Sequence, residues 1–149
     1  MDTISPEHRS WNMSRIRSND TKPETYLRKL LFADGFRYRL HDKRLPGKPD
    51  LYFPRYNAVV FVHGCFWHRH EGCRYATSPK TNQEYWNAKF KRNTERDKEQ
   101  IKLLHSMKIR TAVVWECRIK EMMKSEETKK ELLDTLENWL KGKQTSLEL

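Results

Sequence analysis

The sequence of 149 residues contains no long hydrophobic run, and its longest apolar stretch is the five-residue segment Ala58–Val62. A membrane-spanning helix needs roughly 18 or more consecutive apolar residues, and a secretory signal needs an apolar segment near the N-terminus. We therefore expect neither a membrane protein nor a secreted one, and a cytoplasmic location is expected.

Cysteine, glycine and proline are also scarce. The three cysteines cannot all pair within one chain, so a disulfide framework is not expected. The five glycines and six prolines are scattered along the sequence, which shows neither an internal repeat nor a low-complexity linker. A chain of this length without a linker predicts a single domain over residues 1–149.

Acidic residues are outnumbered, since 30 Lys and Arg stand against 20 Asp and Glu and give a net charge of +10. This excess predicts a polyanionic partner such as nucleic acid, although a basic surface can also serve solubility alone. The first 20 residues combine basic and apolar side chains with little regular period, which suggests an N-terminal arm that contacts DNA. Its candidate DNA-binding residues are Met13, Arg15, Ile16 and Arg17.

Hydrophobic periodicity predicts alternating helices and strands. A first helix is capped at Asp20 or Thr21 and ends at Gly35, around an apolar stripe that includes Leu27. Next comes a strand over 36–41 whose basic face holds Arg37, Arg39 and His41. The remaining predicted elements are hairpin strands over 50–53 and 58–62, a helix over 84–107, a strand over 109–115 and a helix over 132–140. This order predicts an α/β fold with a small mixed sheet flanked by helices.

Cysteine and histidine gather in the polar loop between the hairpin and the long helix. Cys65, His70 and Cys73 lie within nine residues, and Cys117 follows the last predicted strand. Thiolates and imidazole are the ligands that zinc prefers, and a metal would organise a loop that has no core of its own. His68 competes with His70 as the nitrogen ligand, and spacing does not choose between them. The alternatives are a buried apolar role for Cys117 and a redox pair of Cys65 and Cys73.

Asp50 opens a predicted strand after the Pro-containing turn Leu45–Pro49. A carboxylate suits a hard cation such as Mg²⁺, and hairpin pairing would bring the Val62 carbonyl and the His63 imidazole beside it. Glu24, in the first turn of the first helix, is a second candidate acid. Each carboxylate also has an ordinary explanation, because Asp50 can mark a strand entry and Glu24 can stabilise a helix N-terminus.

Large aromatic side chains form a further candidate set. Phe66 and Trp67 lie in the polar loop, and Trp86 begins the long helix. Near a basic surface, such side chains can stack on bases or wedge between them. The loop setting of Phe66 and Trp67 favours exposure, whereas core packing explains Trp86 equally well. Trp115 and Trp139 lie on apolar faces and are predicted to be core residues.

Several segments together form a recognisable pattern. They are Asn12–Ser14, Leu45–Asp50, Phe61–His68, Pro79–Asn82, Glu84–Trp86, Asn93–Asp97 and Val114–Cys117. Spread over about 100 residues, this pattern resembles the very short patch repair endonucleases, which nick DNA at T:G mismatches. The resemblance implies a restriction-endonuclease-like core with a structural zinc.

The resemblance also implies roles at a reaction centre. Asp50 would bind one or two Mg²⁺ ions together with the backbone carbonyl of Val62, and His63 and His68 would act beside them with support from Glu24. Of the two histidines, His68 is the candidate general base. Some members of the family carry Thr where this chain has Val62, so a side-chain hydroxyl has no role at this position.

The remaining implied roles concern zinc and DNA. One structural zinc would be held by Cys65, His70, Cys73 and Cys117, which favours His70 over His68 as the nitrogen ligand. The residues expected to contact the duplex, besides the arm, are Phe66, Trp67, Trp86 and Asn93.

The implied activity is a single nick 5′ to the mispaired T. The expected partner is double-stranded DNA with a T:G mismatch, bound by a monomer, with mismatch-repair proteins as further candidate partners. Two alternatives remain open. A zinc-stabilised DNA-binding module without catalysis would leave Asp50 and His63 without a role, and a nuclease for another lesion or a plain duplex site would keep both.

Overall fold

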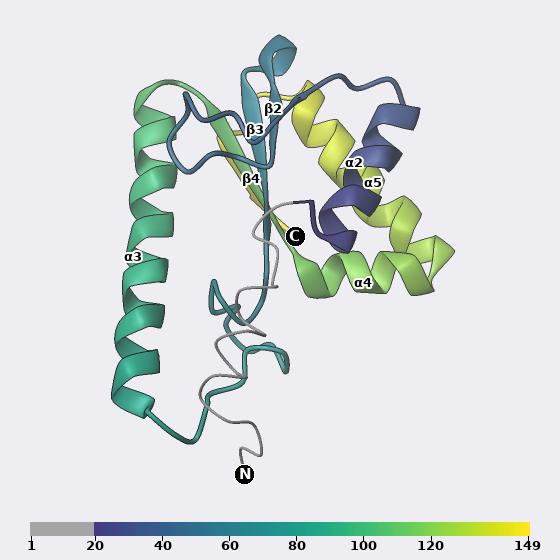
Figure 1. The fold of residues 1–149 in the computed structure, drawn as a ribbon. Helices are drawn as coiled ribbons and strands as arrows, with labels where there is room; N and C mark the ends of the chain where they lie inside the picture. Colours follow the sequence, from purple (N-terminus) through teal and green to yellow (C-terminus); the bar gives the residue numbers. More distant parts are fainter. Residues whose placement is uncertain (1–19) are drawn as a thin grey trace.

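The computed structural model describes residues 20–149 (Figure 1). Four helices lie in this range: α2 (Lys22–Ala33), α3 (Gln83–Ser106), α4 (Glu116–Lys124) and α5 (Glu126–Lys141). The strands are β1 (Arg39–Leu40), β2 (Leu51–Phe53), β3 (Ala58–His63), β4 (Arg110–Trp115) and β5 (Ser146–Glu148), and a 3₁₀ turn, η1 (Pro54–Tyr56), joins β2 to β3.

The strands form one mixed sheet in the order β1-β2-β3-β4-β5. β1, β2 and β3 are antiparallel neighbours, whereas β4 runs parallel to β3 and β5 parallel to β4. In the parallel pair, Val62 lies opposite Val114 and His63 opposite Trp115. The predicted hairpin and the predicted small mixed sheet are therefore confirmed.

Helices cover both faces of the sheet, with α3 on one face and α2, α4 and α5 on the other (Figure 1). An apolar core lies on each face of the sheet, and successive side chains of β3 point alternately into one core and the other. Val60 packs in the core under α2, α4 and α5, whereas Val59 and Phe61 pack in the core under α3. This double burial explains the continuous apolar runs of β3 and β4, as expected for strands covered on both faces. The predicted α/β arrangement is confirmed.

Local signals explain the position of α2. Thr21 is the N-cap, and its Oγ1 accepts a hydrogen bond from the Glu24 N–H at 3.4 Å. The helix ends at Ala33, and Gly35 follows in the left-handed region with φ +97°. Of the two predicted caps, Thr21 is thus the one used, and this cap places Glu24 in the first helical turn.

The strand predicted over residues 36–41 is mostly wrong. Only Arg39–Leu40 pair with β2, and both residues are exposed. Phe36 packs in the core instead, with its ring 6.2 Å from that of Phe53, and the chain turns at His41, where φ is +47°. The predicted basic strand face therefore does not form.

Two elements, α4 and β5, were not predicted from the sequence. The predicted role of Cys117 at a strand end is also corrected: β4 passes directly into α4, so Cys117 lies in the first turn of that helix. The predicted core positions of Trp115 and Trp139 are confirmed, since these side chains are 7% and 4% exposed.

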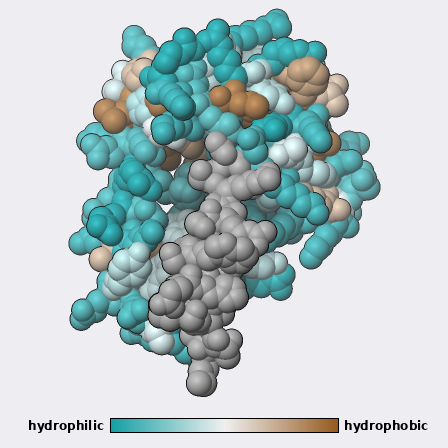
Figure 2. Space-filling model, viewed as in Figure 1, coloured by the Kyte–Doolittle hydropathy of each residue, from teal (hydrophilic) through white to brown (hydrophobic). Residues whose placement is uncertain are grey.

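None of the helices in residues 20–149 is long and apolar enough to cross a membrane. Figure 2 shows a largely hydrophilic face with small, separate apolar patches. Small apolar patches of this kind are ordinary, and on this face of residues 20–149 they mark no extended apolar surface (Figure 2).

Candidate active site and metal centre

Asp50 lies immediately before β2, at the edge of the sheet where β3 ends. Its Oδ2 accepts a hydrogen bond from the Val62 N–H at 2.6 Å, so the hairpin brings these two residues together through the N–H of Val62. The turn before Asp50 depends on Gly47, which has φ +79°; a Cβ there would lie 2.8 Å from Oε1 of Gln100 on α3. Burial raises the pKa of Asp50 to about 8, and the nearby Glu24 carboxyl adds to this rise.

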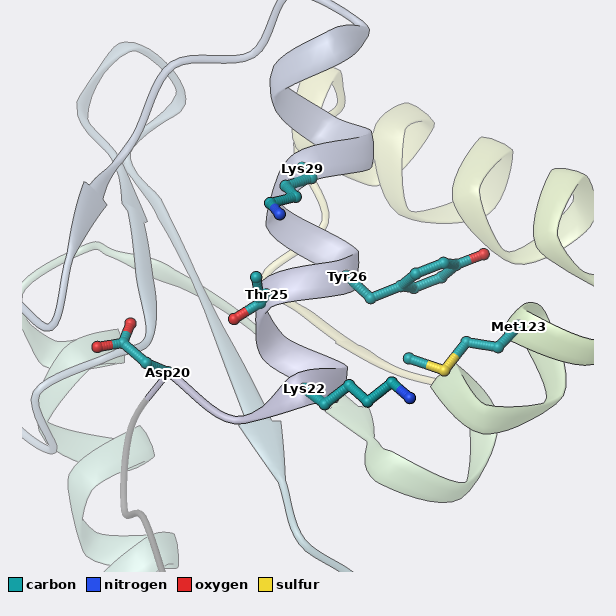
Figure 3. Close-up of a pocket in the computed structure, with 6 residues that line it drawn as sticks. All are labelled: Asp20, Lys22, Thr25, Tyr26, Lys29 and Met123. Carbon is teal, nitrogen blue, oxygen red and sulfur yellow. The ribbon is translucent and has the colours of Figure 1, made fainter.

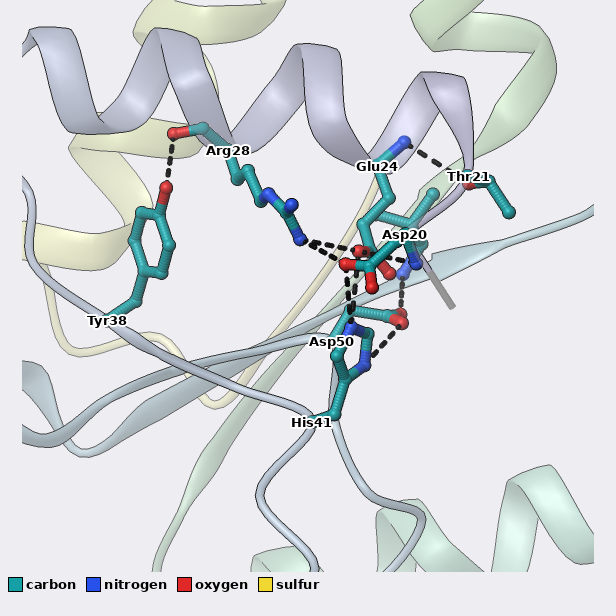
Figure 4. Close-up of polar contacts among 8 residues, drawn as sticks. Asp20, Thr21, Glu24, Arg28, Tyr38, His41 and Asp50 are labelled. Atoms are coloured by element: carbon teal, nitrogen blue, oxygen red, sulfur yellow. Dashed lines mark hydrogen bonds and ion pairs between the residues drawn. The ribbon is translucent and has the colours of Figure 1, made fainter. Parts of the chain in front are cut away.

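The Glu24 side chain is almost fully buried, 2% exposed, and it points toward Asp50 rather than into solvent (Figure 4). Its Oε2 lies 3.1 Å from Nη1 of Arg28 and accepts a hydrogen bond from the Asp20 N–H at 3.1 Å. A carboxylate that served only the helix dipole would not need burial. The packing therefore favours a specific role for Glu24 at this site.

His41 completes this group, which we call the acidic cluster: Asp20, Glu24, His41 and Asp50, with Arg28 at its edge (Figure 4). The His41 Nε2 lies 3.3 Å from Glu24 Oε2, and Nδ1 lies 3.7 Å from Asp50 Oδ1. The ligand-type atoms of Asp20, Glu24 and His41 lie within 4.8 Å of one another. Sequence reasoning missed this role of His41, and no periodic signal points to it.

A second group stands at the end of β3. The rings of His63 and His68 stack with centroids 3.9 Å apart and planes within 5° of parallel. Burial lowers the pKa of His63 to about 3, and the neighbouring His68 adds to this effect, so His63 is neutral near pH 7. The two predicted histidines are therefore brought together.

Asp97 on α3 orients His68. Its Oδ2 lies 2.6 Å from His68 Nδ1, and because an ionised carboxylate only accepts hydrogen bonds, the imidazole donates through Nδ1. Nε2 is then the nitrogen that can accept a proton. Asp97 is a residue that sequence reasoning missed, although it ends the segment Asn93–Asp97 of the family pattern.

The four predicted zinc ligands come together from the loop and from α4. The ligand atoms of Cys65, His70, Cys73 and Cys117 lie within 4.8 Å of one another. His70 Nδ1 is 3.6 Å from the Cys65 Sγ and 3.4 Å from the Cys117 Sγ, and its ring stacks on Trp115 at 4.2 Å. His70 thus lies in this cluster, whereas His68 turns away to Asp97.

Phe66, Trp67 and Trp86 are half-buried and pack on one another and on Phe90; we call these four residues the aromatic cluster. Ring centroids of Phe66 lie 5.0 Å from Trp67 and 5.8 Å from Trp86. Asn93, expected to contact DNA, donates from Nδ2 to the Trp67 carbonyl at 3.3 Å and so braces the same cluster. The other expected DNA contacts, Met13, Arg15, Ile16 and Arg17, lie outside the described residues.

A separate open pocket of about 610 Å³ lies on the other side of α2 (Figure 3). Asp20 is the one residue that this pocket shares with the acidic cluster. The other lining residues are Lys22, Thr25, Tyr26, Lys29 and Met123. Neither Asp50 nor the histidine pair lines this pocket, so it is separate from both groups apart from Asp20.

Comparison of the sequence with known proteins shows the family of this chain. The family model described as DNA mismatch endonuclease Vsr matches residues 1–74, which include Glu24, Asp50, His63 and His68. The DNA mismatch endonuclease Vsr of Escherichia coli (strain K12) is 38% identical over 141 residues, covering 95% of this chain and 88% of that protein. The chain belongs to the Vsr family. The resemblance to the very short patch repair endonucleases is thereby confirmed.

Two nicking enzymes also match over most of their length. The type II nicking enzyme V.XorIIP of Xanthomonas oryzae pv. oryzae is 44% identical over 133 residues, 89% of this chain and 97% of that protein. The type II nicking enzyme V.NmeAIP of Neisseria meningitidis serogroup A is 44% identical over 119 residues, 80% of this chain and 84% of that protein. The Vsr likeness therefore extends well beyond residue 74.

Proposed function

We propose that this protein is a Mg²⁺-dependent endonuclease that nicks one DNA strand 5′ to the T of a T:G mismatch. The observation that carries the proposal is the Asp50 carboxyl, which is buried beside Glu24 and accepts the N–H of Val62, the residue directly before His63 of the stacked histidine pair. Membership of the Vsr family supplies the DNA substrate. We further propose that residues 1–149 form one nuclease domain with a restriction-endonuclease-like core.

The acidic cluster fits a hard cation. Two carboxylates are buried together, and their mutual proximity contributes to the raised pKa of Asp50, which is the situation that a divalent cation relieves. Asp50 would hold Mg²⁺ with the backbone carbonyl of Val62, one or two ions being bound, while Glu24 supports the site. Bound Mg²⁺ supplies a Lewis acid for the scissile phosphate and charge stabilisation for the leaving oxygen.

His68 is the proposed general base. Asp97 fixes the imidazole through Nδ1, and Nε2 is then free to take a proton from the attacking water. The neutral, buried ring of His63 stacks on His68 and limits its rotation. His63 therefore serves as a neighbour at the reaction centre that holds the base in one orientation.

The cysteine and histidine cluster fits one structural zinc. A tetrahedral zinc with Zn–S bonds of about 2.3 Å places its ligand atoms roughly 3.5–4 Å apart, and the four ligand atoms here already lie within 4.8 Å. Cys65, His70 and Cys73 would thereby be tied to Cys117 on α4. That connection would hold the loop carrying His68 and Phe66 against the end of the sheet.

This zinc assignment predicts a specific loss. Cys117→Ser should remove the single zinc and lower the melting temperature on the order of 10 °C, the size expected when a few kcal/mol are lost from a domain this large. Elemental analysis and thermal unfolding measure both effects. His68→Gln is the control and should retain one zinc, because His68 lies outside the cluster. Zinc retained at full stoichiometry in Cys117→Ser would contradict the assignment.

Mismatch selectivity is proposed to come from the aromatic cluster. A T:G pair stacks less rigidly than a Watson–Crick pair, so wedging side chains beside it costs less, and the deformation becomes a source of selectivity. The net charge of +10 favours the DNA backbone, and the N-terminal arm over residues 1–20 would add further contacts. We propose that the protein acts as a monomer in the bacterial cytoplasm, with mismatch-repair proteins as further partners.

The proposed function is tested with three duplexes that differ at one position, T:G, C:G and T:A. In Mg²⁺, we expect single-strand nicking of the T:G duplex alone, with end labels placing the cut 5′ to the T. Nicking of all three duplexes at similar rates would contradict mismatch recognition, although the protein would still be a nuclease. No nicking of any duplex would favour a DNA-binding module without catalysis.

Trp67→Ala should erase much of the preference for T:G over C:G. The expected loss is about 1–3 kcal/mol if Trp67 stacks on a base. Trp139→Ala is the contrast and should cost about 3–5 kcal/mol of stability as a large core deletion, with the preference unchanged. Single-turnover rates are compared at one fixed salt concentration, because the basic surface makes affinity salt-dependent. If Trp67→Ala discriminates T:G from C:G as well as the parent does, contacts to base edges must account for the selectivity.

A further inference from the structure

Arg69 stands between the proposed base His68 and the proposed zinc ligand His70, and its backbone is unusual. Its φ is +54°, in the left-handed region that a non-glycine residue seldom adopts. Such a conformation persists only where surrounding contacts hold it. The contacts of the Arg69 side chain are therefore informative.

The guanidinium of Arg69 joins two ends of the loop. Its Nη1 donates to the carbonyls of Phe66 at 3.2 Å and Thr77 at 2.9 Å. Its Nη2 donates to the Ala76 carbonyl at 3.1 Å and to Ser78 Oγ at 3.3 Å. The two Nη atoms carry four hydrogens, so these bonds use them all and leave only Nε–H for another acceptor. A phosphate contact is thus not the main task of this arginine.

The same guanidinium also lies on the aromatic cluster. Its Cζ is 4.0 Å from the ring centroid of Phe90 and 5.6 Å from that of Phe66. Phe90 is a buried residue of α3, 6% exposed, and its ring lies 5.2 Å from that of Phe66. Arg69 therefore links Phe66, residues 76–78 and α3, and Trp67 packs on Phe66 with ring centroids 5.0 Å apart. A cation is attracted to the face of an aromatic ring, which strengthens the contact with Phe90.

We propose that Arg69 is a positioning residue that sets T:G selectivity by holding Phe66 and Trp67 rigid. This inference rests on the proposed function, in which the aromatic cluster enters the duplex. A wedge discriminates between stacks of different stiffness only when the wedge itself does not yield, because a yielding side chain adapts to every base step. Arginine provides this rigidity because its planar fork bonds several acceptors at fixed angles, which an ammonium group does not.

The test compares Arg69→Ala, Arg69→Lys and a matched control, Arg74→Ala. Arg74 lies in the same loop, is exposed and donates to the Tyr75 hydroxyl, so its removal deletes the same charge without touching the aromatic cluster. Three quantities are measured: zinc content, single-turnover nicking of T:G and C:G duplexes, and the fluorescence of a 2-aminopurine placed beside the mismatch.

Arg69→Ala should lower the T:G to C:G rate ratio at least about 10-fold and reduce the 2-aminopurine signal that reports unstacking, while zinc stays bound. Arg69→Lys should recover part of the ratio, because a cation returns to Phe90 but cannot bridge Phe66 to residues 76–78. Arg74→Ala should keep the parent ratio and signal. If Arg69→Ala fails to retain zinc, the inference is tested with zinc-loaded Arg69→Lys, again by the T:G to C:G rate ratio and the 2-aminopurine signal.

The inference is overturned by zinc-loaded Arg69 variants that keep the parent rate ratio, or by an equal loss in Arg74→Ala. These outcomes leave the proposed function intact when the parent prefers T:G. A parent enzyme without preference for T:G would overturn the proposed function and this inference together, so the two failures are distinguishable.

Discussion

Asp50→Asn is expected to abolish Mg²⁺-dependent nicking while T:G binding survives. The amide keeps the size of the carboxylate and can still accept the Val62 N–H, but it removes the anionic oxygen that we assign to the metal. The aromatic cluster and the basic surface are unchanged, so binding should remain within a few-fold. Single-turnover nicking and a binding titration in Ca²⁺ separate the two effects.

The fold of this variant should not suffer. Asp50 is buried beside Glu24, and its raised pKa, about 8, means that ionisation near neutral pH opposes folding when no cation is bound. The folded state favours the protonated carboxyl, so this penalty grows as pH rises from the unfolded pKa toward 8. In metal-free buffer at pH 8, Asp50→Asn should melt no lower than the parent.

The control for activity is Asp134→Asn, which changes an exposed carboxylate on α5 and should leave nicking normal. Near-normal nicking by Asp50→Asn would refute the assignment.

The sequence predicts best those elements whose burial is simple. β3 and β4 are found because both faces are covered, so almost every residue is apolar. α4 is missed because it is short and charged, and because its N-cap residue, Trp115, makes no side-chain capping bond. β5 is missed because three residues at the sheet edge are held by backbone pairing with β4, which leaves no hydrophobic alternation.

At the site, residues joined by local geometry are predictable and residues brought by tertiary packing are not. The Asp50–Val62 contact follows from the pairing of two strands joined by a short turn, and the cluster of three cysteines and His70 follows from ligand chemistry in a short loop and after a predicted strand. His41 reaches Glu24 only because the chain turns with a positive φ at that residue. Asp97 reaches His68 because α3 packs on one face of the sheet (Figure 1), and periodicity does not encode which helix residue then lies beside the loop.

His68→Ala is expected to lower the single-turnover rate on T:G DNA by roughly 10²–10⁴-fold, the usual cost of losing a general acid or base. Binding should change little, because the imidazole is held by Asp97 and His63 and not by the aromatic cluster. The pH–rate profile is the sharper measurement. If Nε2 takes the proton, the pH–rate profiles of the parent and of His68→Ala should differ in shape.

Asp97 supplies the graded control for this assignment. Asp97→Asn keeps the shape of the partner but removes its charge, and the amide can donate to Nδ1 and so reverse the tautomer of His68. Its nicking rate should therefore fall between those of the parent and His68→Ala. His105→Gln changes a histidine that pairs with Thr111 Oγ1 near the other end of α3, and it should nick at the parent rate. A fully active His68→Ala would mean that His63 or solvent acts as the general base. An unchanged nicking rate in Asp97→Asn would show that the rate does not depend on orientation of His68 by the carboxylate.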